Sequence, residues 1–423
     1  MPLSVDNEYA VPTTVGGSVV ESAVSSWPAV TYEDRRWVTS FARGEVSGRQ
    51  WIQMQQPYAA AVTPEVADRK VSINSQLLAD AEEASVLLSR FDSRAGATVL
   101  PFESILLRSE SASSSQIENL TSSARAVAEA ELGERDHGNA ALIVRNVRAL
   151  SAALELADEL SDETIVAMQA ALLAESAPEK TGEYRVEQVW IGGNAVSPHR
   201  ADFIPPVAER VPSAMHDLLG FARRTDVPVI AHVAIAHAQF ETIHPFLDGN
   251  GRTGRALVQS LLRRRGTTLN VAVPVSAGLL HDLDAYFAAL TAYRAGDIEP
   301  IVTVFVDAAG EAVRNGNLLF DDIRTIREEY DAALSGLRSD AAARRVAGVA
   351  FEHPVVNVVL LQQHLGIADQ TAYRAIDTLV ERGILTPARP GRRNRSWAAS
   401  DITDALDRFA ARAGRREGVR AGR

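Results

Sequence analysis

The sequence lacks several features that would point to particular classes of protein. None of its 423 residues is cysteine, which excludes disulfide bridges, thiolate zinc sites and cysteine nucleophiles and suits a cytoplasmic protein. The longest apolar run, Val227 to Phe240, contains His232 and His237 and is too short to span a bilayer. Residues 1–20 have no basic start followed by an apolar stretch, so we expect no signal peptide, no membrane contact and a cytoplasmic location.

The chain also lacks the basic excess of a protein that coats nucleic acid, since its net charge is −11. The charge is uneven, however. Residues 351–423 hold 12 arginines, no lysine and 8 acidic residues, which gives +4, whereas the remainder carries −15. A mildly basic end on an acidic body suggests that the two parts have different partners.

No internal repeat is present, and the chain is longer than one ordinary domain. Changes in composition divide it into an N-terminal arm, a helical region, a helical core, a connecting helix, a small C-terminal domain and a tail. The corresponding ranges are 1–60, 61–135, 136–315, 316–350, 351–410 and 411–423. We therefore predict a mainly α-helical protein with one short hairpin and a separate C-terminal module.

Apolar residues recur at helical spacing over most of the body. The helical pattern starts near Pro64, breaks at Asp92 to Ala97, and gives way to a serine-rich stretch from Glu110 to Leu120. Alternation with a period of two between Tyr184 and Ile191 predicts a strand that ends in the turn Gly192-Gly193-Asn194. Further helices are predicted at 136–160, 162–175 with Asp162 as N-cap, 213–223, 228–240, 251–264, 284–294 and 299–315.

The strongest chemical signal is the segment HPFLDGNGRTGR, from His244 to Arg255, between two predicted helices. Its glycines let the backbone approach a ligand, and the helix that follows offers free N–H groups to an anion. Arg252 and Arg255 lie three apart on one face of that helix and can grip phosphate oxygens. Asp248 supplies the hard oxygen that Mg²⁺ prefers, and His244 is placed to accept a proton.

Two other interpretations fit this segment less well. GNGRTG also matches the dinucleotide fingerprint GxGxxG, which requires a preceding strand and a βαβ unit, whereas here a helix and His-Pro precede it. His237, Glu241 and His244 could line one helix face around a metal, but HExxH is absent and Pro245 ends the helix. We therefore expect His232 and His237 to be buried residues of the core or its surroundings.

The segment resembles the Fic motif, HPFxDGNGRxxR, at every defined position. The resemblance extends over about 64–309 and implies an all-helical core that moves AMP from Mg²⁺-ATP onto a protein hydroxyl. Such a transfer needs positioning, charge neutralisation and one base, with little covalent work by the protein.

The resemblance implies roles for the residues of the motif. His244 would be the base, Asp248 the Mg²⁺ ligand, and Phe246 the anchor of the loop in the core. The two arginines would neutralise the leaving pyrophosphate. The nucleotide phosphates would be held by Gly249, Asn250, Gly251, Arg252, Thr253, Gly254 and Arg255.

A segment upstream, Ser114 to Asn119, resembles the family's inhibitory motif, S/T-x-x-x-E-G/N. In that interpretation Glu118, with Ser114 at the first position, would pair with Arg255 and remove the group that holds the γ-phosphate. The position before the phosphate loop is that of the class with an N-terminal inhibitory helix. The alternative is a capping box over Ser115 to Glu118, in which Glu118 merely closes a helix start.

Two further features resemble the same family. The hairpin that turns at Ile191, Gly192 and Gly193 resembles the flap, which pairs with the backbone of the target protein, although an ordinary hairpin is the alternative. Tyr286 lies on a stretch that resembles the closing helix. It would contact the nucleotide base, unless it is a core aromatic.

The segment from Asn357 to Trp397 resembles a winged helix-turn-helix, with Asp369 to Arg382 as the recognition helix. The same fold used for protein contact or dimerisation is an equal alternative. The side chains expected at DNA are Gln370, Thr371, Tyr373 and Arg374 in that helix and Arg389, Arg392, Arg393 and Arg395 in the wing.

Together these patterns predict an autoinhibited protein adenylyltransferase that uses ATP and Mg²⁺, with a target protein or the chain itself as acceptor. Two alternatives stay open: a winged-helix DNA-binding regulator that senses ATP without turnover, and an enzyme that removes AMP with the same site. The intact His244 favours catalysis, since sensing needs no base. Homodimer formation is also left open.

Overall fold

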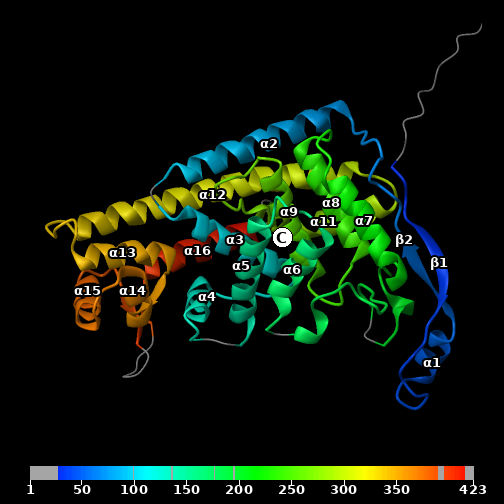
Figure 1. Cartoon of the computed structure of the whole chain (residues 1–423), viewed down its shortest axis with the longest axis horizontal. Helices are drawn as coiled ribbons and strands as arrows, with labels where there is room; N and C mark the ends of the chain where they lie inside the picture. The colour runs from blue at the N-terminus through cyan, green and yellow to red at the C-terminus, as the bar shows by residue number, and fades with distance from the viewer. Residues whose placement is uncertain are drawn as a thin grey trace, which may run out of the picture.

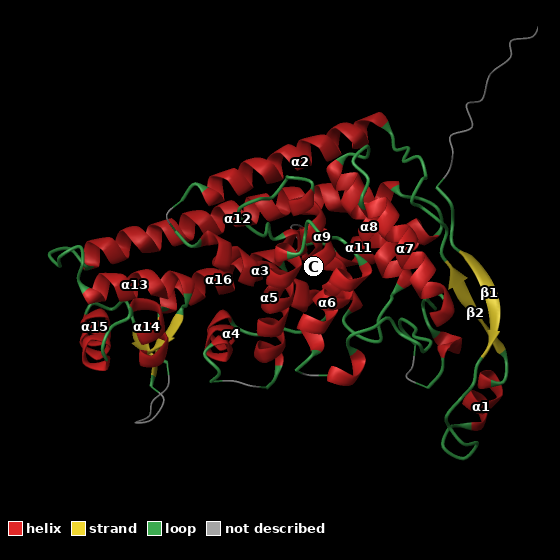
Figure 2. Cartoon of the chain, viewed as in Figure 1, coloured by secondary structure: helices red, strands yellow, loops and turns green. Residues whose placement is uncertain are grey.

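The computed structural model describes residues 27–98, 100–134, 137–175, 177–193, 196–388 and 395–414. In these ranges the chain is mainly helical, as predicted, and its few strands lie toward the two ends of the molecule (Figures 1 and 2). The elements are β1 (Thr31–Arg36), α1 (Gly48–Met54), β2 (Pro57–Val62), α2 (Ser75–Gly96), α3 (Phe102–Ile117), α4 (Ala124–Glu131), α5 (Asn139–Glu155), α6 (Asp162–Leu173), α7 (Val211–Ala222), α8 (Val229–Ile243), α9 (Asn250–Arg264), α10 (Val275–Leu280), α11 (Leu283–Arg294), α12 (Glu299–Ala333), α13 (Ala342–Glu352), β3 (Val355–Asn357), α14 (Val358–Leu365), α15 (Asp369–Glu381), β4 (Thr386–Pro387), β5 (Ser396–Ala398) and α16 (Ser400–Ala413). None of the helices in the described ranges is both long and apolar enough to cross a membrane.

The core is built around α8. Every residue of this helix from Ile230 to Ile243 is buried, as expected for a helix that is packed on all sides. Its neighbours are α2, α7, α9, α11 and α12, and α2 and α12 run side by side along one long edge of the molecule (Figure 1). His232 and His237 are fully buried, which confirms the prediction that they belong to the core.

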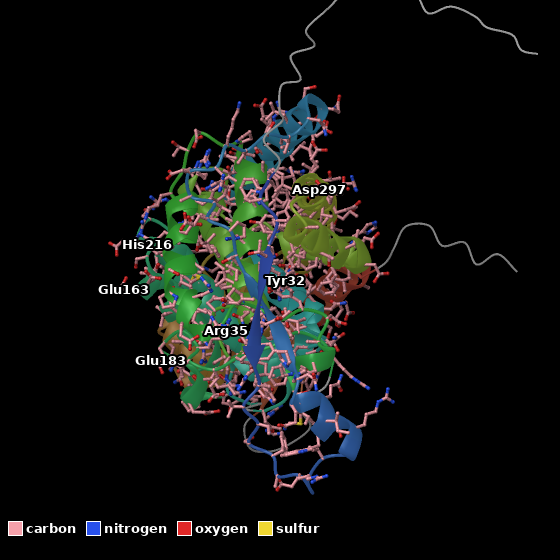
Figure 3. All side chains as sticks on the ribbon, turned by 90° about the vertical axis from the view of Figure 1, so that its right-hand side faces the viewer. Tyr32, Arg35, Glu163, Glu183, His216 and Asp297 are labelled. Carbon is pink, nitrogen blue, oxygen red and sulfur yellow. The ribbon has the colours of Figure 1, made fainter. Side chains whose placement is uncertain are left out.

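Residues 27–60 form more than the extended arm that the sequence predicts. β1 and β2 pair antiparallel, with Thr31 opposite Val62, and α1 lies between them in the chain. Small residues in β2 explain the hairpin, because Ala60 and Ala61 are fully buried and pack against the segment 203–207. Tyr32 and Arg35 lie on β1 at the molecular surface (Figure 3).

The break predicted at Asp92 to Ala97 is wrong, because α2 continues to Gly96. Asp92 is buried and accepts hydrogen bonds from the backbone N–H groups of Leu269, Asn270 and Val271. Asp92, which in the sequence suggests the end of a helix, therefore accepts hydrogen bonds from a loop that is distant in the chain.

The serine-rich stretch from Glu110 is also helical, since it forms the second half of α3. Its serines are small enough to be buried against neighbouring helices. Asn146 of α5 donates hydrogen bonds to the carbonyl of Ser111 and to the hydroxyl of Ser115. The capping-box alternative for Glu118 is wrong, because this residue ends a helix and the next helix starts only at Ala124.

The predicted N-cap of α6 is displaced by one residue. The cap is Ser161, whose hydroxyl accepts a hydrogen bond from the N–H of Thr164. Asp162 is the first residue inside the helix and accepts a hydrogen bond from the hydroxyl of Tyr184 at 2.6 Å.

No regular strand forms between Tyr184 and Ile191, and the described part of the predicted hairpin is limited to one bridge between Ile191 and Phe203. The segment instead folds around the buried side chain of Arg185, which donates hydrogen bonds to the carbonyls of Glu187 and Pro206. The turn residue Asn194 lies outside the described residues.

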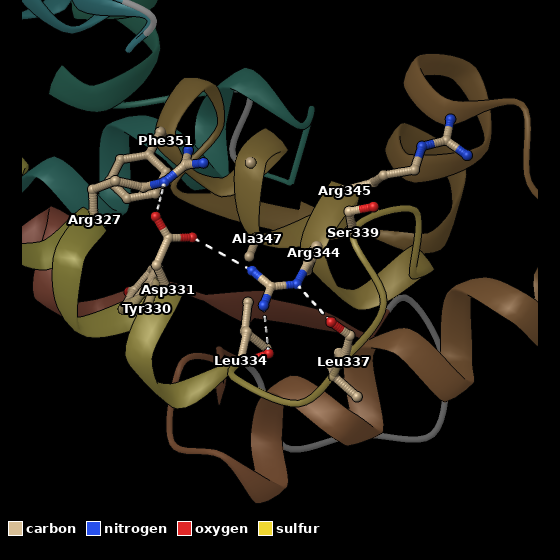
Figure 4. A pocket seen from close by; sticks show the side chains of 11 residues that line it. Arg327, Tyr330, Asp331, Leu334, Leu337, Ser339, Arg344, Arg345, Ala347 and Phe351 are labelled. Carbon is tan, nitrogen blue, oxygen red and sulfur yellow. Dashed lines mark hydrogen bonds and ion pairs between the residues drawn. The ribbon is translucent and has the colours of Figure 1, made fainter.

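The helix predicted at 299–315 continues to Ala333, and α13 then packs back near its end. Arg344 donates hydrogen bonds to the carbonyls of Leu334 and Leu337, and Asp331 lies between it and Arg327 (Figure 4). These groups border a hollow of about 500 Å³. Because the guanidinium binds carbonyls at the C-cap of α12 and in the loop that follows, it fixes the joint between α12 and α13.

After α13 the elements follow the order β3, α14, α15, β4, β5, with the strands arranged β3-β5-β4. The two predicted helices thus occur within one residue of their expected bounds. The predicted contact residues Gln370, Thr371, Tyr373 and Arg374 are exposed, and the guanidinium of Arg395 lies over the ring of Trp397. Arg389, Arg392 and Arg393 lie outside the described residues.

Candidate active site

The predicted phosphate loop connects α8 to α9 in a sharp turn with two left-handed residues. His244 ends α8 with φ 52° and ψ 62°, and Gly249 precedes α9 with φ 80°. A left-handed conformation is unusual for a histidine, and it takes the chain out of α8 toward the buried Phe246. The first intrahelical bond runs from the N–H of Thr253 to the carbonyl of Gly249, so the preceding amides of α9 are available to an anion.

Asn250 holds this loop closed. Its side-chain oxygen accepts a hydrogen bond from the N–H of Phe246 at 2.9 Å, and its side-chain nitrogen donates to the carbonyl of Phe246 at 2.8 Å. The side chain is therefore committed to the loop rather than directed at a phosphate as the sequence analysis predicts. Its backbone N–H, in the first turn of α9, is the group that faces an anion site.

Arg255 is bound by the end of α3. Its Nε donates to the hydroxyl of Ser114 at 2.9 Å, and its Nη2 donates to the carbonyl of Ser114 and to Oε1 of Glu118, both at 2.8 Å. Burial alone would raise the pKa of Glu118, but the charge and hydrogen bond of Arg255 outweigh it, and the pKa lies below its usual value. The structure thus brings together the three residues that the inhibitory motif predicts.

The turn after Glu118 explains the last position of that motif. Asn119 has φ 60°, a conformation that glycine and asparagine adopt most readily. The N–H of Asn119 bonds the carbonyl of Gln116, and the N–H of Leu120 bonds the carbonyl of Ser115. This pair of hydrogen bonds is a Schellman motif, which commonly ends helices. It directs the Glu118 side chain toward the start of α9.

The start of α9 has the properties of an anion-binding site, and this site at Gly251, Arg252 and Arg255 is referred to as the seat. A β carbon on Gly251 would lie 2.0 Å from Oε1 of Glu118, so a carboxylate already occupies the space above this glycine. Arg252 is 8% exposed, and its Nε and Nη1 find no hydrogen-bond partner among the described residues. Buried guanidinium N–H groups need acceptors, and phosphate oxygens would supply them.

Asp248 stands at the rim of this seat. Its Oδ1 accepts a hydrogen bond from the N–H of Gly249 at 2.7 Å, and its Oδ2 lies 3.6 Å from Nζ of Lys180. The side chain is 45% exposed, so its second oxygen is accessible to a ligand. The amide of Gln169 reaches the carbonyls of Lys180 and Asp248, which holds the rim in place.

His244 is neutral near pH 7 because burial, and next the charge of Arg185, lower its pKa to about 4. Arg185 also positions it: Nε donates to the carbonyl of His244 at 2.8 Å, and the backbone N–H donates to the carbonyl of Pro245 at 2.9 Å. A neutral imidazole can accept a proton. Sequence analysis missed Arg185, because its partners lie about 60 residues away in the chain.

The seat opens into a cavity of about 640 Å³ that also contains His244. Trp190, Ile191 and Phe203 line its rim. There the N–H of Ile191 donates to the carbonyl of Phe203 at 2.9 Å. The guanidinium of Arg294 lies 3.7 Å from the centre of the Phe203 ring. The predicted flap residue Ile191 is therefore at the cavity, although a single bridge replaces the predicted hairpin.

Gly192 and Gly193 follow with φ 74° and 76°. Both approach a neighbouring chain segment closely, since a β carbon would meet Asp202 at one and the backbone of Arg200 at the other. Glycine is required here for space as well as conformation. No sequence signal identified Asp202, which lines the cavity beside Ile191.

Tyr286 lines the cavity but is almost fully buried in its wall. It is 2% exposed, and its hydroxyl forms a 2.7 Å hydrogen bond with Nε2 of His237. This geometry fits the alternative of a core aromatic. The neighbouring Phe287, which is half exposed and lines the same cavity, is better placed to meet a nucleotide base.

Comparison with known proteins agrees with the site. Residues 159–262 match the model of the Fic/DOC family. The chain carries a Fic domain. The match runs from just before α6 into the last turns of α9 and includes His244, Asp248 and Arg255. It leaves out α3 with Glu118, so the family match does not bear on the contact between Glu118 and Arg255.

Two relatives of the Fic domain illustrate the similarity. The chain is 30% identical over 148 residues to protein adenylyltransferase fic-1 of Caenorhabditis elegans, which covers 34% of this chain and 26% of the relative. It is 30% identical over 161 residues to protein adenylyltransferase Fic of Drosophila willistoni, covering 38% and 30%. The chain thus spans less than a third of the length of either relative.

A solved structure shares the fold over a longer range. A Fic family protein from Desulfovibrio desulfuricans G20 superposes with a TM-score of 0.50 over 80% of this chain and 98% of that chain, at 22% identity. This similarity shows a common fold that extends beyond the matched Fic segment.

Proposed function

We propose that this chain is a protein adenylyltransferase that moves AMP from Mg²⁺-ATP to a hydroxyl side chain of a target protein or of the chain itself. We further propose that Glu118 holds it in an inhibited state. The observation that carries the proposal is the carboxylate of Glu118 seated above Gly251 and bonded to Arg255. A seat that accepts a carboxylate between two buried arginines can accept a phosphate. The relatives named protein adenylyltransferase support the choice of reaction.

The residues fit a magnesium ion held mainly by substrate phosphates. Asp248 offers one accessible carboxylate oxygen, and Mg²⁺ is commonly bound by one or two carboxylates together with phosphates. When bound, the ion would neutralise phosphate charge. Arg252 and the amides at the start of α9 would orient the triphosphate, and Arg255 would hold its distal end once Glu118 withdraws.

In the transfer, the acceptor oxygen forms a bond to the α-phosphorus while the bond from that phosphorus to the β-phosphate oxygen breaks. Pyrophosphate leaves, and the hydroxyl proton passes to the imidazole of His244. Since its pKa is about 4, this imidazole is unprotonated at neutral pH and ready to act. Ile191 at the cavity rim would orient the acceptor backbone.

Labelled ATP tests this proposal with three proteins: wild type, Glu118→Gly and the double variant Glu118→Gly/His244→Ala. We expect weak labelling of protein by the wild type and stronger labelling by Glu118→Gly, since the substitution frees the seat. His244→Ala in the Glu118→Gly background should still bind ATP but lose about 10²–10⁴-fold in transfer. ATP binding without any labelling by Glu118→Gly would refute the transferase proposal.

Removal of AMP is a second candidate, because the carboxylate of Glu118 lies in the same cavity as His244 and Asp248 and could orient a water molecule. A preparation labelled by Glu118→Gly provides the substrate. Loss of label with wild type, but not with Glu118→Gly, would identify this reverse activity.

We also infer that the module predicted at 351–410 is a winged helix. The order of helices and strands supports this, as do the exposed residues of α15 that the sequence predicts for DNA contact. A mobility shift with duplex DNA that weakens with salt would support DNA binding. If Arg374→Ala leaves that shift unchanged, α15 is not the recognition helix.

A further inference from the structure

We propose that Glu241 is the positioning residue for the base: its carboxylate faces Nδ1 of His244, keeps the imidazole in the Nδ1–H tautomer and stabilises the imidazolium formed during transfer. This inference rests on the proposed transferase function and assigns a role to a residue outside the predicted set. A carboxylate behind a catalytic imidazole has this effect in hydrolases.

The geometry places the two groups face to face. Glu241 is in the last turn of α8, three residues before His244, and its Oε2 lies 3.9 Å from Nδ1. Nδ1 is buried and has no hydrogen-bond partner among the described residues, and the same holds for Oε1 of Glu241. A small rotation of the Glu241 side chain would close the gap, and such bonds commonly tighten only when substrate is bound.

Other buried carboxylates of this protein behave differently. Glu110 accepts two hydrogen bonds from Ser276, at 2.9 and 2.6 Å, and Asp92 accepts bonds from three backbone amides. Those groups tie the fold together. Oε1 of Glu241 accepts no hydrogen bond from the described residues, and an unsatisfied buried carboxyl costs stability. Its position beside the base supplies a reason for its presence.

The charged groups around the pair come from several elements. Arg255 of α9, Arg294 of α11 and Glu118 face Glu241. Arg185, Arg294 and Glu118 also face His244, whose ring in addition interacts with the main-chain carbonyl of Glu241. A glutamine at position 241 retains that carbonyl, so it tests the carboxylate alone.

The pair should give transfer a characteristic pH dependence. Burial raises the pKa of Glu241 to about 7, against the opposing effect of Arg255, whereas the pKa of His244 is about 4. Between these values the base is free but Glu241 is protonated, so it cannot stabilise an imidazolium. As the pH rises through about 7 the carboxylate forms, and the transfer rate should rise with it.

The kinetic experiment compares Glu118→Gly with Glu118→Gly/Glu241→Gln at saturating Mg²⁺-ATP between pH 5.5 and 8.5, a range chosen to be roughly centred on the Glu241 pKa. We expect the rise near pH 7 to vanish in the double variant, its rate at high pH to fall about tenfold or more, and its KM for ATP to stay unchanged. Glu241→Asp, which retains a carboxylate, should restore part of the step. Identical profiles for the first two proteins would overturn the proposal.

Nitrogen NMR of the His244 ring provides a readout that does not depend on turnover. Above about pH 7, where the Glu241 carboxylate has formed, Glu241→Gln should shift the neutral ring away from the Nδ1–H tautomer. An unchanged ring spectrum overturns the positioning role even in an active enzyme. If Glu118→Gly shows no transfer, the proposed function fails, and the spectrum still decides whether Glu241 and His244 are coupled.

Discussion

At the scale of single residues, the side-chain amide of Asn250 satisfies both backbone groups of Phe246 across the loop. Both partners are buried, so no water can replace these bonds if the amide is removed. The glycines of the loop allow many backbone conformations. The two hydrogen bonds of Asn250 restrict the loop to one of them at the proposed phosphate site.

We predict that Asn250→Ala lowers the free energy of unfolding by about 1–3 kcal/mol, because it leaves a buried N–H and a buried carbonyl unpaired. ATP binding should weaken as the loop loosens. Urea unfolding and calorimetric ATP titration measure the two effects. Asn250→Asp retains the acceptor and loses the donor, so it should be intermediate in stability. An Asn250→Ala protein as stable as wild type would show that the loop closes without this amide.

Residues that act through contacts distant in the chain escaped the sequence analysis. Arg185 binds the backbone of His244, and Arg294 covers the rim at Phe203. A motif records residues that are close in the chain. Because the bonds of Arg185 and the ring contact of Arg294 depend on how separate segments fold together, no local spacing could predict them.

At the scale of elements, hydrogen bonds hold α3 to its neighbours at two positions. Glu110 binds the backbone N–H and the hydroxyl of Ser276 at the start of α10, and burial raises its pKa to about 7. Ser114 and Glu118 bind Arg255 at the other end. The position of the Glu118 carboxylate is thus set by the whole helix and by the left-handed turn at Asn119.

We predict that Asn119→Val weakens inhibition, whereas the matched control Asn119→Gly does not. A β-branched residue in the left-handed region costs about 1–2 kcal/mol, and relaxing the turn would move Glu118 away from Arg255. Labelling with ATP should therefore increase for Asn119→Val toward the level of Glu118→Gly. Equal labelling by the valine and glycine variants would contradict a role for the turn.

The sequence predicted most helices and the phosphate loop, because periodicity and the motif are local patterns. It misassigned α3 and the flap for physical reasons. The serine-rich stretch interrupted the helical pattern in the sequence, yet its small side chains suit a buried helix face. Alternating residues from Tyr184 suggested a strand, yet the bonds of Arg185 impose a different path. In both cases tertiary contacts outweighed local preference.

At the scale of the whole molecule, the last helix returns from the C-terminal module to the core. α16 contacts α3, α4, α10 and α12, and its Phe409 is buried, with its carbonyl accepting a hydrogen bond from Asn315 of α12. The C-terminal module is therefore linked to α3, the helix that ends at Glu118.

We predict that Phe409→Ala lowers the free energy of unfolding by about 3–5 kcal/mol, the usual cost of emptying a buried phenylalanine site. Loss of packing behind α3 should also raise protein labelling. Urea unfolding followed by circular dichroism measures the first effect. Val359→Ala, at an exposed position of α14, is the control and should stay within about 0.5 kcal/mol. If Phe409→Ala does not change the level of protein labelling, α16 contributes to stability only.

The bonds between α3 and Arg255 have one more consequence. Two of the three come from Ser114, one of them from its main-chain carbonyl, and no side-chain replacement at position 118 removes them. Under the proposed function, the segment that would obstruct the nucleotide therefore also holds the guanidinium of Arg255 in place. Deleting the end of α3 should open the seat but leave Arg255 without its hydrogen bonds to Ser114. We therefore expect such a truncated protein to transfer AMP more slowly than the Glu118→Gly variant.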